Sequence, residues 1–296
     1  MLVLLLAYAL MAATFPLAWV VMQHAQPFFT IGFRMTIAGI FLLGYLLVRG
    51  QSIRFLRSDA KLFVYVILFH IFIAYISEFY GLTMVYGAMA ALIYNLSPFI
   101  TALVSYWVLK ERLSFYKYLG LLIGFLGFLP IAYSQISSGA VLLRSFPFSW
   151  GELLILVSVI SAVFGWMTVR KLVVERSYSP LHVNGIAMLG GGLLSLLCSL
   201  FETWSPIPTT QPAHFMIQIF SLMVLGNFIY YNLIAYLLRS YSQTFISFAG
   251  FVTPLFAAFY DWLFFGHVMG KEFYLASIFV SLGLYLFYSD ELCSQK

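Results

Sequence analysis

Long apolar runs follow one another along almost the whole 296-residue chain. Each is about 20 residues long, enough for a helix to cross the roughly 30 Å hydrocarbon core of a bilayer. Because a chain inside hydrocarbon must satisfy its backbone hydrogen bonds within each segment, and no strand-like alternation is present, we predict helices. The predicted fold class is an all-α membrane protein with ten transmembrane helices, over residues 2–22, 28–48, 61–82, 86–109, 115–133, 150–170, 180–200, 213–236, 244–265 and 271–288.

The composition supports this fold class. Hydrophobic residues make up 63% of the chain and charged residues only 8%, against roughly a quarter charged residues in a soluble domain. A soluble fold lacks the polar surface to cover so much apolar side chain, so the lipid bilayer is a predicted partner. The formal net charge is +5, but the basic residues are scattered among short loops, which argues against binding of nucleic acid.

The two halves of the sequence are related. A shift of 156 residues carries Pro98 onto Pro254. The same shift pairs Ala102 with Ala258, Tyr118 with Tyr274, Leu119 with Leu275, Gly127 with Gly283, Tyr75 with Tyr231 and Tyr80 with Tyr236. We therefore predict a duplication, with a first repeat over residues 1–133, a linker over 134–149, a second repeat over 150–290 and a cytoplasmic tail over 291–296. Five helices per repeat is an odd number, which predicts that the second repeat is inverted in the membrane.

The distribution of basic residues predicts the topology. With the N-terminus in the cytoplasm, all but three of the 15 Lys and Arg residues fall in cytoplasmic loops or in the C-terminal tail. The exceptions are Arg144 and Lys271 in outer loops and Arg34 inside a helix. Because cytoplasmic loops carry the excess of Lys and Arg, we predict a multi-pass protein of the inner membrane with both termini in the cytoplasm.

The same features resemble a known family. They are a helix with Pro98 and Ala102, a charged turn of Lys110, Glu111 and Arg112, a following helix with glycines at 120, 124 and 127, the pair Phe33-Arg34, and two five-helix halves. Together they resemble the EamA-type transporters of the drug/metabolite transporter superfamily. The resemblance implies a ten-helix carrier that moves small metabolites by alternating access through a central cavity. Gly266-His267 stands in the second half where Lys110-Glu111 stands in the first.

Ionisable residues inside membrane helices are costly and are candidate functional residues by default. Glu78 lies in the third predicted helix, one turn from Tyr75. Its carboxylate would bind a cationic part of a substrate or carry a coupling proton. The alternative is a structural ion pair with Arg34, which is predicted at a similar depth in the second helix and is itself a candidate for coupling or gating.

Polar and aromatic side chains at membrane depth are further candidates for substrate binding. Amide and phenol groups would hold a polar ligand, or would only form interhelical hydrogen bonds, which contribute about 0.6 kcal/mol on average in membranes. Aromatic rings beside Glu78 would suit an organic cation through cation–π attraction. The residues concerned are Tyr75, Tyr94, Asn95, Asn227, Tyr231, Trp19 and Trp166.

Three more ionisable residues are candidates for coupling or gating. His70 in the third helix would relay protons, or pack as a neutral, hydrogen-bonded ring between helices. Glu111, between Lys110 and Arg112, would help close a cytoplasmic turn or gate. Asp261 near the outer end of the ninth helix has a hydrated interfacial carboxylate as its simpler interpretation.

The sequence as a whole favours transport over catalysis. It contains no Gly-x-Ser-x-Gly, no His-Glu-x-x-His and no phosphate-binding glycine loop, so we predict no catalytic residue, metal or cofactor. We expect a secondary transporter for a small amino-acid-like or organic-cation metabolite, with S-adenosylmethionine as one candidate, coupled to a proton or a counter-substrate. The alternatives are an exporter of amino acids or drugs and an intramembrane transferase acting on a lipid-linked substrate. A monomer and a homodimer are equally compatible with the sequence.

Overall fold

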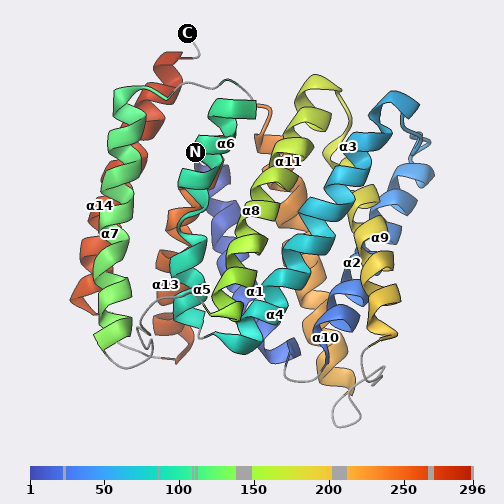
Figure 1. Ribbon diagram of the computed structural model, residues 1–296, viewed down its shortest axis with the longest axis horizontal. Coiled ribbons are helices and arrows are strands. Elements are labelled where there is room, and N and C mark those ends of the chain that lie inside the picture. The colour runs from blue at the N-terminus through green and yellow to red at the C-terminus, as the bar shows by residue number, and fades with distance from the viewer. Residues whose placement is uncertain are drawn as a thin grey trace.

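The computed structural model shows a bundle of helices and describes residues 1–22, 25–85, 87–108, 110, 113–137, 149–201, 212–265 and 270–294. Within these ranges all regular secondary structure is helical (Figure 1). Seven helices of the described ranges are long and apolar enough to cross a membrane, and three shorter apolar helices cover Leu2–Thr14, Ser97–Val108 and Phe115–Gly127. The protein is therefore a multi-pass helical membrane protein.

Helices occupy each of the ten predicted stretches, several of them as two or more joined pieces. The first half contains α1 (Leu2–Met22), α2 (Pro27–Val48), η1 (Arg57–Asp59), α3 (Ala60–Tyr65), η2 (Val66–Phe72), α4 (Ile73–Met84), α5 (Gly87–Tyr94), α6 (Ser97–Val108) and α7 (Phe115–Ser137). The second half contains α8 (Trp150–Arg170), η3 (Lys171–Glu175), α9 (Pro180–Ser199), α10 (Pro212–Leu222), η4 (Met223–Tyr230), α11 (Tyr231–Leu237), α12 (Gln243–Ala249), η5 (Gly250–Val252), α13 (Thr253–Phe265) and α14 (Lys271–Ser294).

The prediction of one continuous helix over residues 86–109 was wrong. Asn95 and Leu96 form a turn between α5 and α6. The physical reason is Pro98, which has no N–H to donate to the carbonyl of Tyr94 and so interrupts the helical hydrogen bonds. The related helix of the second half carries Pro254 and changes pitch at the matching place, in the 3₁₀ turn η5.

Three described helices contain π-helical stretches that the sequence did not reveal. They are η2 in the third helix, η3 at the end of the sixth and η4 in the eighth. The stretches η2 and η4 are related by the internal shift. The 156-residue shift carries Val66–Phe72 onto residues 222–228, so the two stretches lie at nearly equivalent places in the two halves. The wider turn rotates the side chains that follow it, and π-helical stretches frequently occur at functional sites.

Equivalent helices of the two halves pack against each other. The most extensive contacts join α2 to α9 and α7 to α14, and Figure 1 shows the second pair at one edge of the bundle and the first towards the opposite edge. Glycines permit these approaches: a Cβ on Gly39 would lie 2.5 Å from the backbone nitrogen of Leu189, and one on Gly120 would lie 2.8 Å from the carbonyl oxygen of Gly283.

The remaining contacts between the halves follow the same pattern. The first helix, α1, packs against α10 and η4 of the eighth, and the sixth helix, α8, packs against η2 and α4 of the third. In the same way α1 packs against α13, and α8 packs against α6. Each of these contacts between a helix of the first half and a helix of the second half is therefore matched by a contact between the two equivalent helices.

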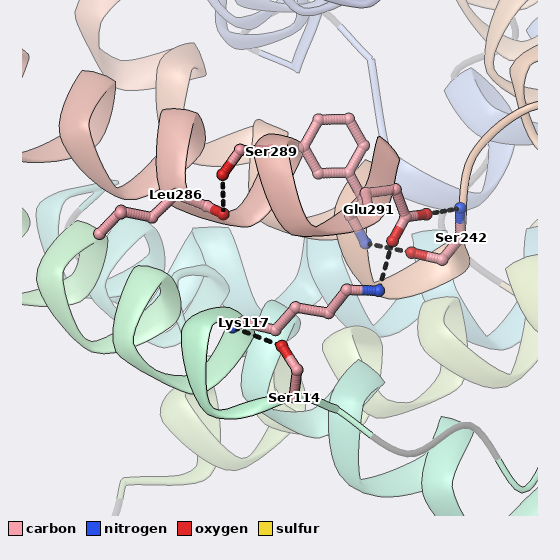
Figure 2. A network of polar contacts seen from close by, with 7 residues as sticks. Ser114, Lys117, Ser242, Leu286, Ser289 and Glu291 are labelled. Atoms are coloured by element: carbon pink, nitrogen blue, oxygen red, sulfur yellow. Dashed lines mark hydrogen bonds and ion pairs between the residues drawn. The ribbon is translucent and has the colours of Figure 1, made fainter. Parts of the chain in front are cut away.

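Polar contacts join the loops at one end of the bundle. Lys117 Nζ lies 2.5 Å from Glu291 Oε2 in a buried ion pair between α7 and α14. The other carboxylate oxygen of Glu291 accepts a hydrogen bond of 2.7 Å from the backbone N–H of Ser242 at the start of α12. Figure 2 shows the carboxylate of Glu291 between these two partners.

A second group of contacts lies at the same end. Tyr178 donates a hydrogen bond of 3.0 Å to Asp59, and Arg176 pairs with the same carboxylate at 3.2 Å. Arg239 donates to the carbonyl oxygen of Tyr178 at 3.2 Å. These contacts bring together the segment before α3, the η3–α9 connection and the α11–α12 connection, all of which carry basic residues and are predicted to share one side of the membrane.

Candidate functional site

Four ring-bearing side chains from both halves of the chain meet inside the bundle. His70 comes from η2, Tyr75 from α4, Trp166 from α8 and Tyr231 from α11. We call these four residues the aromatic cluster. His70 and Tyr75 lie about midway along the helix formed by η1, α3, η2 and α4, so the cluster is well separated from the ends of that helix.

The rings of the aromatic cluster are in direct contact. The ring centroid of His70 lies 4.4 Å from that of Trp166 and 5.1 Å from that of Tyr231, both edge-on. Trp166 and Tyr231 stack at 5.3 Å. Tyr231 also donates a hydrogen bond of 2.6 Å to the hydroxyl of Tyr75. These are the separations at which aromatic pairs attract one another, and they fix the relative positions of three helices.

Local structure explains how these rings come together. Gly165 lies against η2, and a Cβ there would be 2.5 Å from the Cα of His70. This close approach lets the neighbouring Trp166 reach the imidazole. His70 is 1% exposed, and neither of its ring nitrogens has a hydrogen-bond partner among the described residues. The alternative prediction for His70 was a neutral ring hydrogen-bonded between helices. The described part of the chain provides no such hydrogen bond.

Two charged groups border the aromatic cluster at Tyr75. The Cζ atom of Arg34, from α2, lies 5.1 Å from the centroid of the Tyr75 ring, a cation–π geometry. Glu78 follows Tyr75 by one turn of α4, and the charge of Arg34 acts on its carboxylate. No ion pair within 4 Å joins Arg34 to Glu78; the ion pairs between described residues are Lys117–Glu291 and Arg176–Asp59.

Tyr94, at the end of α5, connects Glu78 to the second half of the chain. Its hydroxyl donates to the Glu78 carboxylate and lies 3.0 Å from the hydroxyl of Ser158 in α8. Asn95, the next predicted residue, is 7% exposed in the turn between α5 and α6.

The side chain of Asn227 contacts two methionines of α2 and α9. Its side-chain nitrogen lies 3.0 Å from the sulfur of Met35 and 3.6 Å from that of Met188, and its backbone carbonyl oxygen accepts from Asn232. Asn227 lies within the π-helical stretch η4 and contacts methionines of α2 and α9, while Tyr231, the first residue after η4, joins the aromatic cluster.

Three predicted residues lie outside what the structure describes. Glu111 falls in a segment that is not described, and the side chains of Trp19 and Asp261 are not described within α1 and α13. The predictions for these residues remain predictions.

Sequence reasoning missed two residues of this region. Tyr8 of α1 contacts Tyr230 edge-on at 6.1 Å and donates a hydrogen bond of 2.5 Å to the carbonyl oxygen of Ile246. Ser158 holds Tyr94. Tyr8 is a single tyrosine in an otherwise aliphatic stretch, and this isolation was the available signal. Ser158 carried no signal, because serines are common in membrane helices as hydrogen-bonding residues.

The site is suited to recognition of a small polar ligand. It offers aromatic faces, one cationic group and one carboxylate inside a helical bundle. No cluster of three or more His, Cys, Asp or Glu residues that could hold a metal ion occurs in the described ranges. The fold and the candidate site together define a multi-pass helical membrane protein in which aromatic side chains of both halves meet inside the bundle.

The family follows from the sequence as a whole. The model of the EamA-like transporter family matches residues 1–133 and 149–289. This chain therefore belongs to the EamA-like transporter family, which lies in the drug/metabolite transporter superfamily.

Individual relatives are more specific. A protein of Chlamydia muridarum (strain MoPn / Nigg) named S-adenosylmethionine/S-adenosylhomocysteine transporter is 36% identical over 290 residues, which cover 95% of this chain and 88% of that protein. A protein of Chlamydia trachomatis serovar L2 with the same name is 34% identical over 288 residues, covering 95% and 86%. A solved crystal structure superposes with a TM-score of 0.78 at 17% identity, covering 100% of this chain and 97% of that one, which shows a shared fold.

Proposed function

We propose that this protein is a secondary transporter that exchanges S-adenosylmethionine for S-adenosylhomocysteine across the inner membrane. The observation that carries the proposal is the aromatic cluster with Glu78 at its border, inside a chain whose relatives at 34–36% identity bear the name of such a transporter. The sequence alone predicted a small amino-acid-like or organic-cation metabolite as the substrate. We now restrict the proposed substrates to S-adenosyl compounds.

The chemistry of the site matches that of the ligand. S-adenosylmethionine has an adenine ring, a sulfonium cation and an amino-acid end. Stacking of a nucleobase on an aromatic side chain contributes about 1–3 kcal/mol, and the stacked pair Trp166 and Tyr231 supplies such faces. The sulfonium is attracted to aromatic faces as other organic cations are, and Glu78 adds a negative charge beside them.

The packing of the two halves supports alternating access. Equivalent helices pair as α2 with α9 and α7 with α14, and the remaining contacts occur in exchanged pairs. The aromatic cluster draws His70 and Tyr75 from one half and Trp166 and Tyr231 from the other. In the proposed mechanism ten helices form two inverted repeats, and these rock about the cluster to open it first to one side of the membrane and then to the other.

The orientation in the membrane is part of the proposal. The end of the bundle where Lys117, Arg176 and Arg239 make their contacts is assigned to the cytoplasm, because basic residues accumulate in cytoplasmic loops. The amino group of Met1 donates to Tyr241 at 2.8 Å, and Glu291 near the other end of the chain binds Ser242. Met1 and Glu291 therefore lie on the side proposed as cytoplasmic.

Ligand binding by the purified protein tests the substrate. A ligand that binds only the folded state stabilises it, by about 2.7 kcal/mol at a hundredfold excess over its dissociation constant. We expect S-adenosylmethionine and S-adenosylhomocysteine to raise the thermal unfolding temperature in detergent, and polyamines and quaternary amines to leave it unchanged.

Two acidic residues provide matched variants for this test. Glu78→Gln removes the charge beside the cluster and should weaken stabilisation by S-adenosylmethionine at least tenfold in ligand concentration. Glu175→Gln removes an exposed carboxylate in η3 and should change nothing. Stabilisation of the wild-type protein by drug-like cations or free amino acids alone would favour the exporter alternative and overturn the assignment of the substrate.

A further inference from the structure

Arg34 lies over the ring of Tyr75 and Glu78 follows Tyr75 by one turn of α4, and no ion pair within 4 Å joins the two among the described residues. The guanidinium lies over the ring of Tyr75, is 6% exposed, and its Nε has no hydrogen-bond partner among the described residues. The carboxylate one turn further along α4 is held by Tyr94. The two charges influence each other, but neither forms an ion pair with a described residue.

This separation is unusual for a structural pair. A charged residue at the centre of a membrane helix costs about 2.5–3.5 kcal/mol on insertion scales, and residues with no other purpose reduce that cost by pairing directly. The loop end of this protein shows such direct pairing, with Lys117 and Glu291 at 2.5 Å. Arg34 and Glu78 instead place one positive and one negative group in the neighbourhood of Tyr75 without such a direct pair.

We propose that Arg34 binds the α-carboxylate of the substrate and Glu78 binds its α-ammonium group, so that the amino-acid end bridges the two residues. This inference rests on the proposed transport of S-adenosyl compounds. A guanidinium forms two parallel hydrogen bonds with a carboxylate, and the free Nε of Arg34 is one of its donors. An α-amino acid carries a carboxylate and an ammonium group on the same α-carbon, so its end offers one group to Arg34 and the other to Glu78.

The arrangement explains how one site accepts two ligands. S-adenosylmethionine and S-adenosylhomocysteine share the amino-acid end and the adenine ring, and differ in the methyl group and charge at sulfur. Anchoring at the two shared ends, on Arg34 and Glu78 at one side and on the stacked rings of Trp166 and Tyr231 at the other, leaves the sulfur between them. The site therefore requires the zwitterion and tolerates a change at sulfur.

Truncated ligands test this directly on the wild-type protein. The probes are S-adenosylmethionine, S-adenosylhomocysteine, decarboxylated S-adenosylmethionine, which lacks only the carboxylate, and methionine. Binding is measured by calorimetry in lipid nanodiscs. Loss of the carboxylate should weaken binding at least tenfold, even though the decarboxylated compound carries more positive charge. Equal or tighter binding of the decarboxylated compound would overturn the proposal without the use of any variant.

Variants assign the effect to Arg34. Arg34→Gln should weaken S-adenosylmethionine binding at least tenfold while leaving the decarboxylated compound within twofold of its wild-type affinity, and Arg34→Lys should restore part of the loss. Arg49→Gln, at an exposed arginine just after the same helix, is the matched control. Equal weakening of both ligands by Arg34→Gln would show that Arg34 does not recognise the carboxylate and would overturn its assigned role.

The outcomes also separate this inference from the proposed function. Binding of methionine that depends on Arg34 and Glu78, without binding of S-adenosyl compounds, would support the zwitterion site and reject the proposed substrate. Binding of S-adenosyl compounds that does not depend on the ligand's carboxylate would support the proposed substrate and reject the zwitterion site. A protein that binds none of the four probes would contradict both.

Discussion

Tyr231 donates a hydrogen bond of 2.6 Å to Tyr75, and the two residues are separated by 156 positions, the shift that relates the two halves of the sequence. Residues at equivalent positions of two related halves touch only where the halves meet on their relating axis. The aromatic cluster is therefore at the junction of the halves, where the rocking of one half against the other that we propose would change access to both sides of the membrane.

The paired hydroxyls yield a prediction about stability. Tyr75→Phe and Tyr231→Phe should each lower the free energy of unfolding by about 1 kcal/mol, the usual net contribution of one hydrogen bond. The double variant should lose much less than the sum of the two, because both substitutions remove the same contact. Chemical denaturation in detergent measures the three values. Strict additivity would show that the hydroxyls do not interact.

Trp166 should determine affinity for the adenine ring. We expect Trp166→Ala to weaken binding of S-adenosylhomocysteine at least tenfold, since stacking of a base contributes about 1–3 kcal/mol, and Trp166→Phe to retain most of it. Calorimetry with S-adenosylhomocysteine and with adenosine measures the effect. Trp150, which is 78% exposed at the start of α8, provides the control Trp150→Ala; equal losses in the two alanine variants would contradict a role for Trp166 in stacking.

Gly165 should be required for the assembly of the cluster. Gly165→Ala places a methyl group 2.5 Å from the Cα of His70, a backbone atom that cannot yield, so α8 must move away from η2. Overpacking of this kind costs about 1–3 kcal/mol, and binding of S-adenosylhomocysteine should fall with stability. The matched control is Gly44→Ala in α2, where a Cβ meets nothing within 4 Å; an equal effect there would make Gly165 irrelevant to packing.

The ion pair of Lys117 and Glu291 should stabilise the protein without contributing to ligand recognition. Lys117→Met leaves a buried carboxylate, and loss of one partner from a buried pair costs about 3–5 kcal/mol. The double variant Lys117→Met with Glu291→Leu should recover part of this loss. Thermal unfolding measures stability, and the ratio of affinities for S-adenosylmethionine and methionine should stay at its wild-type value. A change in that ratio would indicate that the pair affects the site.

Much of the fold was accessible from the sequence, because long apolar runs permit only helices in a bilayer. The duplication also identifies Tyr75 and Tyr231 as equivalent positions from the sequence alone. What could not be predicted depends on local helix pitch. Asn227 lies within the π-helical stretch η4 and Tyr231 follows it, and the turn at Asn95 interrupts a helix predicted to be continuous. Periodicity arguments assume one constant pitch, so they fail at such places.

Ion pairing between charged residues could not be predicted from the sequence either. Sequence depth places Arg34 and Glu78 at similar levels and leaves open whether they form an ion pair. In the structure the guanidinium of Arg34 lies over the ring of Tyr75, and no ion pair within 4 Å joins it to Glu78. The pairing of Lys117 with Glu291 has no sequence signal, because the two residues are 174 positions apart and the second belongs to the predicted tail.

Exchange in reconstituted vesicles tests the central claim most directly. Purified protein is placed in liposomes loaded with S-adenosylhomocysteine, and entry of labelled S-adenosylmethionine is followed, with Glu78→Gln and protein-free liposomes in parallel. We expect rapid uptake that exceeds uptake into unloaded vesicles and is lost in the variant. Uptake no faster than in protein-free liposomes, with a protein shown to be folded by its thermal unfolding, would contradict the proposed function.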